Sequence, residues 1–96
     1  MTTHLIFAEA NSLITKRLGK SVGERTGDLL QRSDFVQLVF LDEVVHREAW
    51  NLYKKYRDKD FDYIDATSFV FCKRRGIREV LTFDRHFAQM GFRIVP

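Results

Sequence analysis

Apolar residues recur with helical spacing in four segments of the chain. The predicted helices cover about residues 3–18, a segment starting after Ser21, about residues 42–57 and about residues 62–75. The third is the clearest, because Val45, Ala49, Leu52, Tyr53 and Tyr56 repeat on one helical face with charged residues between them. Gly19 and Gly76 follow the first and last segments, where glycine commonly ends a helix. Ser21 and Glu24 have the spacing of a capping box at the start of the second helix.

Three shorter apolar stretches predict strands, at Phe35–Leu41, Glu79–Phe83 and Phe92–Val95. The first is a nearly unbroken apolar run, which is typical of a strand buried on both faces of a parallel sheet. Strands separated by helices predict βαβ units. We therefore expect an α/β fold with three α/β/α layers, in which helices cover both faces of a short parallel sheet. Three strands are few for such a sheet.

Composition places the chain among single-domain globular proteins. It has 96 residues, 45% of them hydrophobic and 30% charged, so we expect one domain over residues 1–96. A single cysteine excludes a disulfide scaffold within the chain and favours a reducing compartment. No apolar run approaches the roughly 20 residues of a membrane span, so we expect a cytoplasmic protein without a membrane partner. The net charge of +3 permits a nucleic-acid partner without arguing for one.

Three acidic residues lie where solvation does not readily explain them. Asp84 directly follows the predicted strand 79–83, at the end of a parallel strand where ligands gather. Glu9 and Asp65 lie on faces of predicted helices. If the three carboxylates converge, their charge of about −3 is costly without a divalent cation. Oxygen ligands of this kind favour Mg²⁺ or Mn²⁺ over zinc.

Each acid also has a simpler interpretation, which stays open at this point. Glu9 fits a solvated helix residue, and Asp65 fits a carboxylate favoured by the dipole at a helix start. Asp84 fits the N-cap of a short helix over residues 85–89. Spacing alone therefore leaves metal binding as the less favoured hypothesis.

Several motifs resemble those of PIN domains, above all the small bacterial VapC-like toxins and related nucleases. They are Ile64-Asp65 with Ser68-Phe69, then Gly76-Ile77-Arg78-Glu79, then Leu81-Thr82-Phe83-Asp84-Arg85-His86-Phe87. The opening segment from Thr2 to Glu9 resembles the acidic second helix of that family. The string LTFDRHF is long and specific, and the resemblance covers the whole chain at varying strength.

The resemblance implies a metal-dependent ribonuclease that hydrolyses RNA phosphodiesters, with RNA and an antitoxin protein as partners. By position, Glu9, Asp65 and Asp84 match three of the four acids that hold the metal in this family. Thr82 matches a small polar residue that helps to orient the substrate or the nucleophilic water. These four residues are the catalytic candidates, and the three acids are the candidate ligands of Mg²⁺ or Mn²⁺.

Basic residues near the predicted centre supply candidate RNA contacts. Arg85 and His86 flank Asp84, and Lys16 and Arg17 end the first predicted helix. Cations in these positions bind phosphates in nucleic-acid-binding proteins. Their simpler interpretation is a solvated helix end for the first helix and a local cap for His86.

The chain departs from the family at its start, so the predicted PIN domain is incomplete there. PIN domains open with a strand that carries an acidic residue and with a first helix, whereas here Met1 directly precedes Thr2. In the family that strand lies between the strands matched by residues 35–41 and 79–83. Three explanations stay open: a shortened reading frame, a natural fragment completed by rearrangement or by swapping in a dimer, and a non-catalytic relic. The alternative function is an inactive PIN-like fragment that acts as an RNA-binding or oligomeric interaction module.

Overall fold

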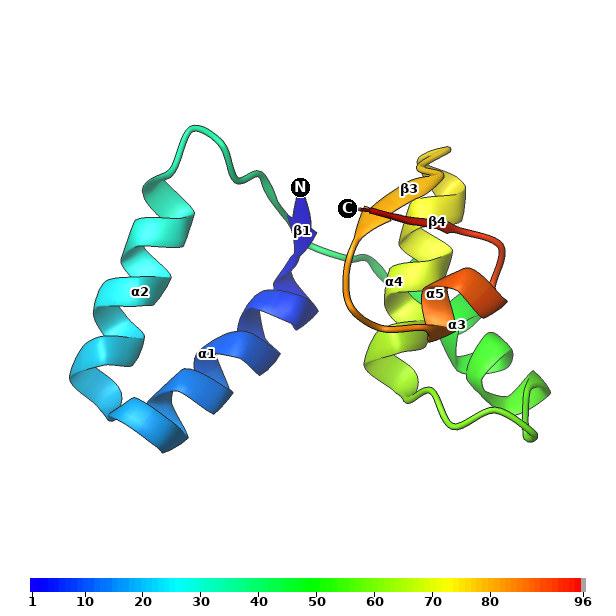
Figure 1. Ribbon diagram of the computed structural model, residues 1–96, viewed down its shortest axis with the longest axis horizontal. Helices are drawn as coiled ribbons and strands as arrows, with labels where there is room; N and C mark the ends of the chain where they lie inside the picture. Colours follow the sequence, from blue (N-terminus) through cyan, green and yellow to red (C-terminus); the bar gives the residue numbers. More distant parts are fainter. Residues whose placement is uncertain (96) are drawn as a thin grey trace. The chain divides into compact units, whose positions relative to one another are not determined.

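Residues 1–95 form two compact units in the computed structural model (Figure 1). The first unit is Met1–Leu41 and the second begins at Asp42. Helices dominate both units, and the strands pair in parallel, which confirms the expected α/β class with short parallel strands. The strands form two separate pairs, β1 with β2 in the first unit and β3 with β4 in the second.

The first unit is a helical hairpin with a short strand pair. Its elements are β1 (Thr2–Thr3), α1 (His4–Leu18), α2 (Lys20–Arg32) and β2 (Leu38–Val39). The hydroxyl of Thr3 caps α1 by accepting a hydrogen bond of 3.2 Å from the backbone N–H of Ile6. Gly19, with φ of 94°, makes the reversal between the helices, so it ends α1 as predicted.

Two glycines on α2 allow the helices of the hairpin to approach closely. Gly23 and Gly27 are buried one turn apart. A Cβ atom at Gly23 would clash with the hydroxyl oxygen of Thr15 on α1. Gly23 also offers its carbonyl to the side-chain amide of Asn11, at 3.0 Å. The packing of α1 therefore opposes a side chain at Gly23, whereas a Cβ atom at Gly27 would meet the side chains of Asn11 and Phe7 at 3.3 and 3.4 Å.

The predicted start of the second helix is wrong. Helix α2 begins at Lys20, one residue before the expected cap Ser21, and the actual N-cap, Gly19, makes no side-chain hydrogen bond. Because the positive φ of Gly19 reverses the chain within one residue, α2 starts directly after α1 and Ser21 already lies inside it. The expected capping box with Glu24 does not form.

The prediction of a buried strand over Phe35–Leu41 is also wrong for most of that run. Only Leu38–Val39 is a strand, and it pairs with β1, with Thr2 opposite Leu38 and Thr3 opposite Val39. The side chains of Phe35 and Phe40 are 97% and 73% exposed. With two paired residues and one neighbouring strand, β2 has too little sheet around it to bury the run.

The second unit follows the predicted order of elements closely. Its elements are α3 (Glu43–Lys55), α4 (Tyr63–Arg74), β3 (Glu79–Leu81), α5 (His86–Gln89) and β4 (Arg93–Val95). Aspartate caps both long helices: Asp42 accepts from the N–H of Val45 at 3.0 Å, and Asp62 accepts from the N–H of Asp65 at 2.9 Å. Side-chain oxygens of this kind satisfy the free N–H groups of the first helical turn.

A cluster of phenylalanine rings fills the core of the second unit. Phe69 of α4 is fully buried, and its ring centre lies 5.2 Å from that of Phe61, 4.8 Å from Phe87 and 6.1 Å from Phe92. The rings of Phe61 and Phe87 meet Phe69 edge to face, a favourable aromatic geometry. Cys72 is buried on the same helix, as expected of a small apolar side chain. These contacts fix α4 against α5 and β4.

We expect Phe69→Ala to lower the free energy of unfolding by about 3–5 kcal/mol, because it removes the ring at the centre of this cluster. Phe83→Ala is the matched control, since Phe83 is 97% exposed, and it should change stability by no more than about 0.5 kcal/mol. Urea unfolding followed by circular dichroism measures both. Equal losses in the two variants would show that the ring cluster is not the main core.

Candidate metal centre

Asp65, Asp84 and His86 come together within the second unit. Each offers one ligand atom, and these atoms all lie within 4.8 Å of one another. Asp65 comes from the first turn of α4, Asp84 from the loop after β3, and His86 from the first position of α5. All three side chains are partly buried. The two acids that the sequence places far apart, one on a helix and one after a strand, thus lie side by side.

Asp65 both caps the start of α4 and belongs to the carboxylate cluster. Its backbone N–H donates to the carboxylate of Asp62, and its own carboxylate accepts from the N–H of Asp62 at 3.0 Å. This reciprocal pair is a capping box that starts α4. Burial raises the pKa of the Asp65 carboxyl to about 6, and the negative charges of Asp62 and Asp84 add to the rise. The ionised form of Asp65 is therefore disfavoured in the folded chain, first by burial and then by the neighbouring carboxylates.

Asp84 is held by the loop that leads into α5. Its backbone N–H donates to the hydroxyl of Thr82 at 3.0 Å, and its carboxylate accepts from the N–H of His86 at 2.9 Å. Helix α5 spans His86–Gln89 with Arg85 as its N-cap, so the expected N-cap role of Asp84 is wrong by one residue, although its carboxylate still accepts from the first N–H of the helix. The bond from His86 holds the carboxylate itself, and the bond to Thr82 holds the backbone that carries it.

The imidazole of His86 lies between two carboxylates. Its Nε2 atom is 2.6 Å from Asp60, and its Nδ1 atom is 2.8 Å from Asp84. The hydrogen bond with Asp60 raises the pKa of His86, and the nearby negative charge of Asp84 contributes to the rise. Nδ1 is shielded from solvent, and its approach to Asp84 lacks hydrogen-bond geometry, so it has no hydrogen-bond partner among residues 1–95.

The donors of this cluster fit a divalent cation. Two carboxylates supply the hard oxygen ligands that Mg²⁺ and Mn²⁺ prefer. Burial, helped by the negative charges of Asp62 and Asp84, raises the pKa of Asp65, and a bound cation would favour its ionised form. The orphaned Nδ1 of His86 lies at the same place. Asp65 and Asp84 are therefore the residues of this unit best suited to hold such an ion.

The remaining predicted residues lie in two different places. Glu9 is exposed on α1, and Lys16 and Arg17 are exposed in the last turn of that helix, all in the first unit. Arg85 is exposed and lies between Asp84 and His86 in the sequence. The hydroxyl of Thr82 accepts a hydrogen bond from the backbone N–H of Asp84. The cluster therefore unites Asp65, Asp84 and His86, with Thr82 supporting it, whereas the roles of Glu9, Lys16, Arg17 and Arg85 stay predictions.

Sequence reasoning missed two members of the site. Asp60 lies in a polar turn 26 residues before its partner His86, so no local pattern indicates the contact. Asp62 is different, because an acid three residues before Asp65 has the spacing of a capping box. That spacing was visible in the sequence and identifies Asp62 as the start of α4.

Comparison with known proteins identifies the family. A family model of the PIN domain matches residues 1–93. The chain belongs to the PIN domain family. It is 24% identical over 92 residues to the 23S rRNA-specific endonuclease VapC20 in two strains of Mycobacterium tuberculosis, with 96% of this chain and 70% of the relative aligned.

The crystal structure of Mycobacterium tuberculosis VapC20, described as a sarcin–ricin loop cleaving toxin, has the same fold. It superposes with a TM-score of 0.87 at 24% identity, covering 96% of this chain and 70% of that one. PIN-domain nucleases of the VapC type generally depend on a divalent metal ion, act on RNA and pair with VapB antitoxins. Within residues 1–95, no helix is both long and apolar enough to cross a membrane.

The raised pKa of Asp65 predicts how stability depends on pH when metal is removed. The folded chain holds this carboxyl with a pKa of about 6 against an ordinary value of 3.8, so it binds the extra proton between these values. Stability of the metal-free chain therefore falls as the pH rises through this range and stays lower above it.

Asp65→Asn removes the unbalanced charge and keeps an oxygen for the N–H of Asp62. Since the carboxyl is only partly buried, we expect a gain of about 1 kcal/mol above about pH 7 in EDTA, or about 4–8 °C in Tm. Below about pH 4 the difference should vanish. Asp58→Asn, in an exposed turn, is the control and should not change Tm. A lower Tm for Asp65→Asn at neutral pH would contradict the assigned direction of the shift.

Proposed function

We propose that this chain is a divalent-metal-dependent endoribonuclease that hydrolyses RNA phosphodiester bonds, with Mg²⁺ or Mn²⁺ as the ion. The observation that carries the proposal is the meeting of Asp65 and Asp84 in a chain of the PIN family. The rRNA endonuclease among its relatives supports RNA as the substrate.

Asp65 and Asp84 hold the ion in this proposal, and Glu9 is its third carboxylate, as the resemblance predicts. When bound, the ion polarises the phosphate and stabilises the charge of the in-line transition state. Asp65 binds in its ionised form, so a pH near or above about 6 favours binding.

The neighbouring residues orient the acids and the substrate. The N–H of His86 holds the carboxylate of Asp84, and the hydroxyl of Thr82 holds the backbone of Asp84. Because the hydroxyl oxygen of Thr82 already accepts from Asp84, its proton is free to be donated to the phosphate or to the attacking water. Arg85 and His86 beside Asp84, with Lys16 and Arg17 at the end of α1, are the proposed contacts for RNA phosphates.

The biological role that we propose is the toxin of a toxin–antitoxin pair. The VapC relatives support an antitoxin chain as the protein partner. We also propose a homodimer as the assembled form and the cytoplasm as the compartment, because RNA is available there. An inactive RNA-binding or interaction module is the alternative outcome that the next experiment tests.

We expect cleavage of 23S rRNA, or of a sarcin–ricin loop oligonucleotide, with Mn²⁺ or Mg²⁺ and none with EDTA. Asp65→Asn and Asp84→Asn should each lower the rate at least about 100-fold, because each removes a charged ligand. Asp58→Asn is the matched control and should keep the full rate. Gel analysis of 5′-labelled RNA measures all of these.

If the unaltered chain binds RNA without cutting it, and binding survives both substitutions and EDTA, the chain is a binding module and the nuclease proposal fails.

Thr82→Val is expected to lower the cleavage rate about fivefold to tenfold. Valine has nearly the shape of threonine but loses the hydroxyl that accepts from Asp84, a bond worth about 1 kcal/mol. Thr82→Ser keeps the hydroxyl and should retain most of the rate. If serine and valine act alike, the hydroxyl does not position Asp84. Initial rates at saturating Mn²⁺ make the comparison.

A further inference from the structure

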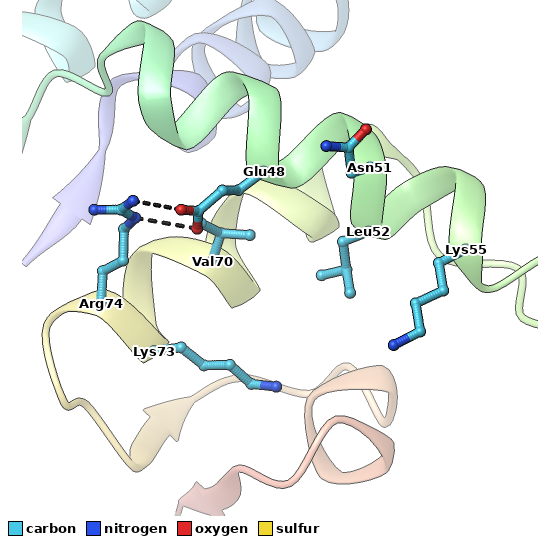
Figure 2. A pocket seen from close by; sticks show the side chains of 7 residues that line it. All are labelled: Glu48, Asn51, Leu52, Lys55, Val70, Lys73 and Arg74. Atoms are coloured by element: carbon cyan, nitrogen blue, oxygen red, sulfur yellow. Dashed lines mark hydrogen bonds and ion pairs between the residues drawn. The ribbon is translucent and has the colours of Figure 1, made fainter.

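A cavity of about 280 Å³ lies between α3 and α4, apart from the carboxylate cluster (Figure 2). Residues of both helices line it, among them Glu48, Leu52 and Lys55 of α3 and Val70, Lys73 and Arg74 of α4. The lining combines apolar Leu52 and Val70 with charged side chains of both helices. No residue of the proposed metal centre lines it.

Two lysines carry the uncompensated charge of this cavity. Arg74 is neutralised, because its guanidinium forms an ion pair with both oxygens of Glu48. Lys55 and Lys73 have no ion-pair partner among residues 1–95. Figure 2 shows their amino groups extending toward one another from the two helices, below Leu52. The amino group of Lys55 also lies 5.4 Å from the centre of the Tyr56 ring, which restrains its direction.

The position of this lysine pair relative to Asp65 follows from α4 itself. Asp65 lies in the first turn of the helix and Lys73 near its end. Eight residues at 1.5 Å each separate them by about 12 Å along the axis, a span that an RNA strand crosses within a few nucleotides. Lys73 also lines an adjoining cavity of about 270 Å³ with Arg78, so positive charge continues beyond the pair.

We propose that the cavity between α3 and α4 is a phosphate-binding subsite for RNA, in which Lys55 and Lys73 hold one backbone phosphate a few nucleotides from the bond that is cut. This inference rests on the proposed ribonuclease function. Paired ammonium groups without carboxylate partners complement a phosphate, and the ion-paired Arg74 and Glu48 close one side. A backbone phosphate carries no base identity, so the subsite adds affinity and register without sequence preference.

The test measures binding of a short fluorescein-labelled single-stranded RNA by anisotropy, with the full chain carrying Asp65→Asn so that RNA stays intact. We expect Lys55→Gln/Lys73→Gln in that background to weaken binding about tenfold or more. The slope of log affinity against log salt should fall by about 0.7, because the variant neutralises one phosphate fewer. Both lysines are exposed, and circular dichroism checks that the variant folds.

Lys54→Gln/Lys59→Gln is the matched control, because it removes the same charge from lysines that do not line the cavity. It should weaken binding by less than about threefold. Equal weakening by the two double variants would overturn the subsite, since it would show only a general charge effect. Unchanged RNA binding together with abolished binding of a glutamate-rich peptide would also overturn it and indicate an acidic protein partner.

Failure of the ribonuclease proposal has a different signature. In that case the unaltered chain shows no metal-dependent cleavage, whereas the dependence of RNA binding on Lys55 and Lys73 is measured separately. With Asp65 restored, the lysine variant should raise KM and leave kcat nearly unchanged, because the lysines contact RNA far from the reacting phosphate. A fall in kcat alone would contradict the subsite.

Discussion

The reciprocal hydrogen bonds between Asp62 and Asp65 start the helix around which the second unit is built. They satisfy free N–H groups at the start of α4 and set the direction of the Asp65 carboxylate. The same helix then carries Phe69 into the aromatic core and ends with Lys73 and Arg74 at the cavity with α3. One twelve-residue helix thus joins the proposed catalytic acid, the core and the basic surface.

This arrangement has an energetic cost at its acidic end. Four aspartates, at positions 60, 62, 65 and 84, lie in hydrogen-bonded or charge contact around Asp65 and His86. Among the described residues 1–95, His86 is the basic side chain in direct contact with two of these acids, Asp60 and Asp84. Burial raises the pKa of Asp65, and the negative charges of Asp62 and Asp84 add to the rise. A bound cation would favour the ionised form of this carboxyl.

Sequence patterns predicted most of the helices well and the strand of the first unit poorly. The repeat of Val45, Ala49 and Leu52 predicts α3, and the buried run of Phe69 to Cys72 lies in the predicted α4, because helical periodicity and caps are local properties. Burial of a strand depends on its neighbours, so the run 35–41 predicted a longer and more buried strand than β2. Gly19 overrode the Ser21 cap because a positive φ reverses the chain in one step.

The candidate site was predicted in part for the same reason. Asp84 follows a strand and Asp65 starts a helix, and the family resemblance joined them before their proximity of less than 5 Å was known. The role of Asp60 could not be predicted from the sequence, because its contact with His86 spans 26 residues and depends on the fold of the turn. His86 was predicted as an RNA contact, and its position between the carboxylates of Asp60 and Asp84 could not be predicted from the sequence. The exposed rings at Phe35 and Phe83, each 97% accessible, lie near the short strands β2 and β3, each of which has one paired neighbour among residues 1–95. Such strand edges beside apolar rings are templates for adhesion between molecules. A second molecule can add a strand at such an edge, so we expect self-association of this chain to increase with its concentration.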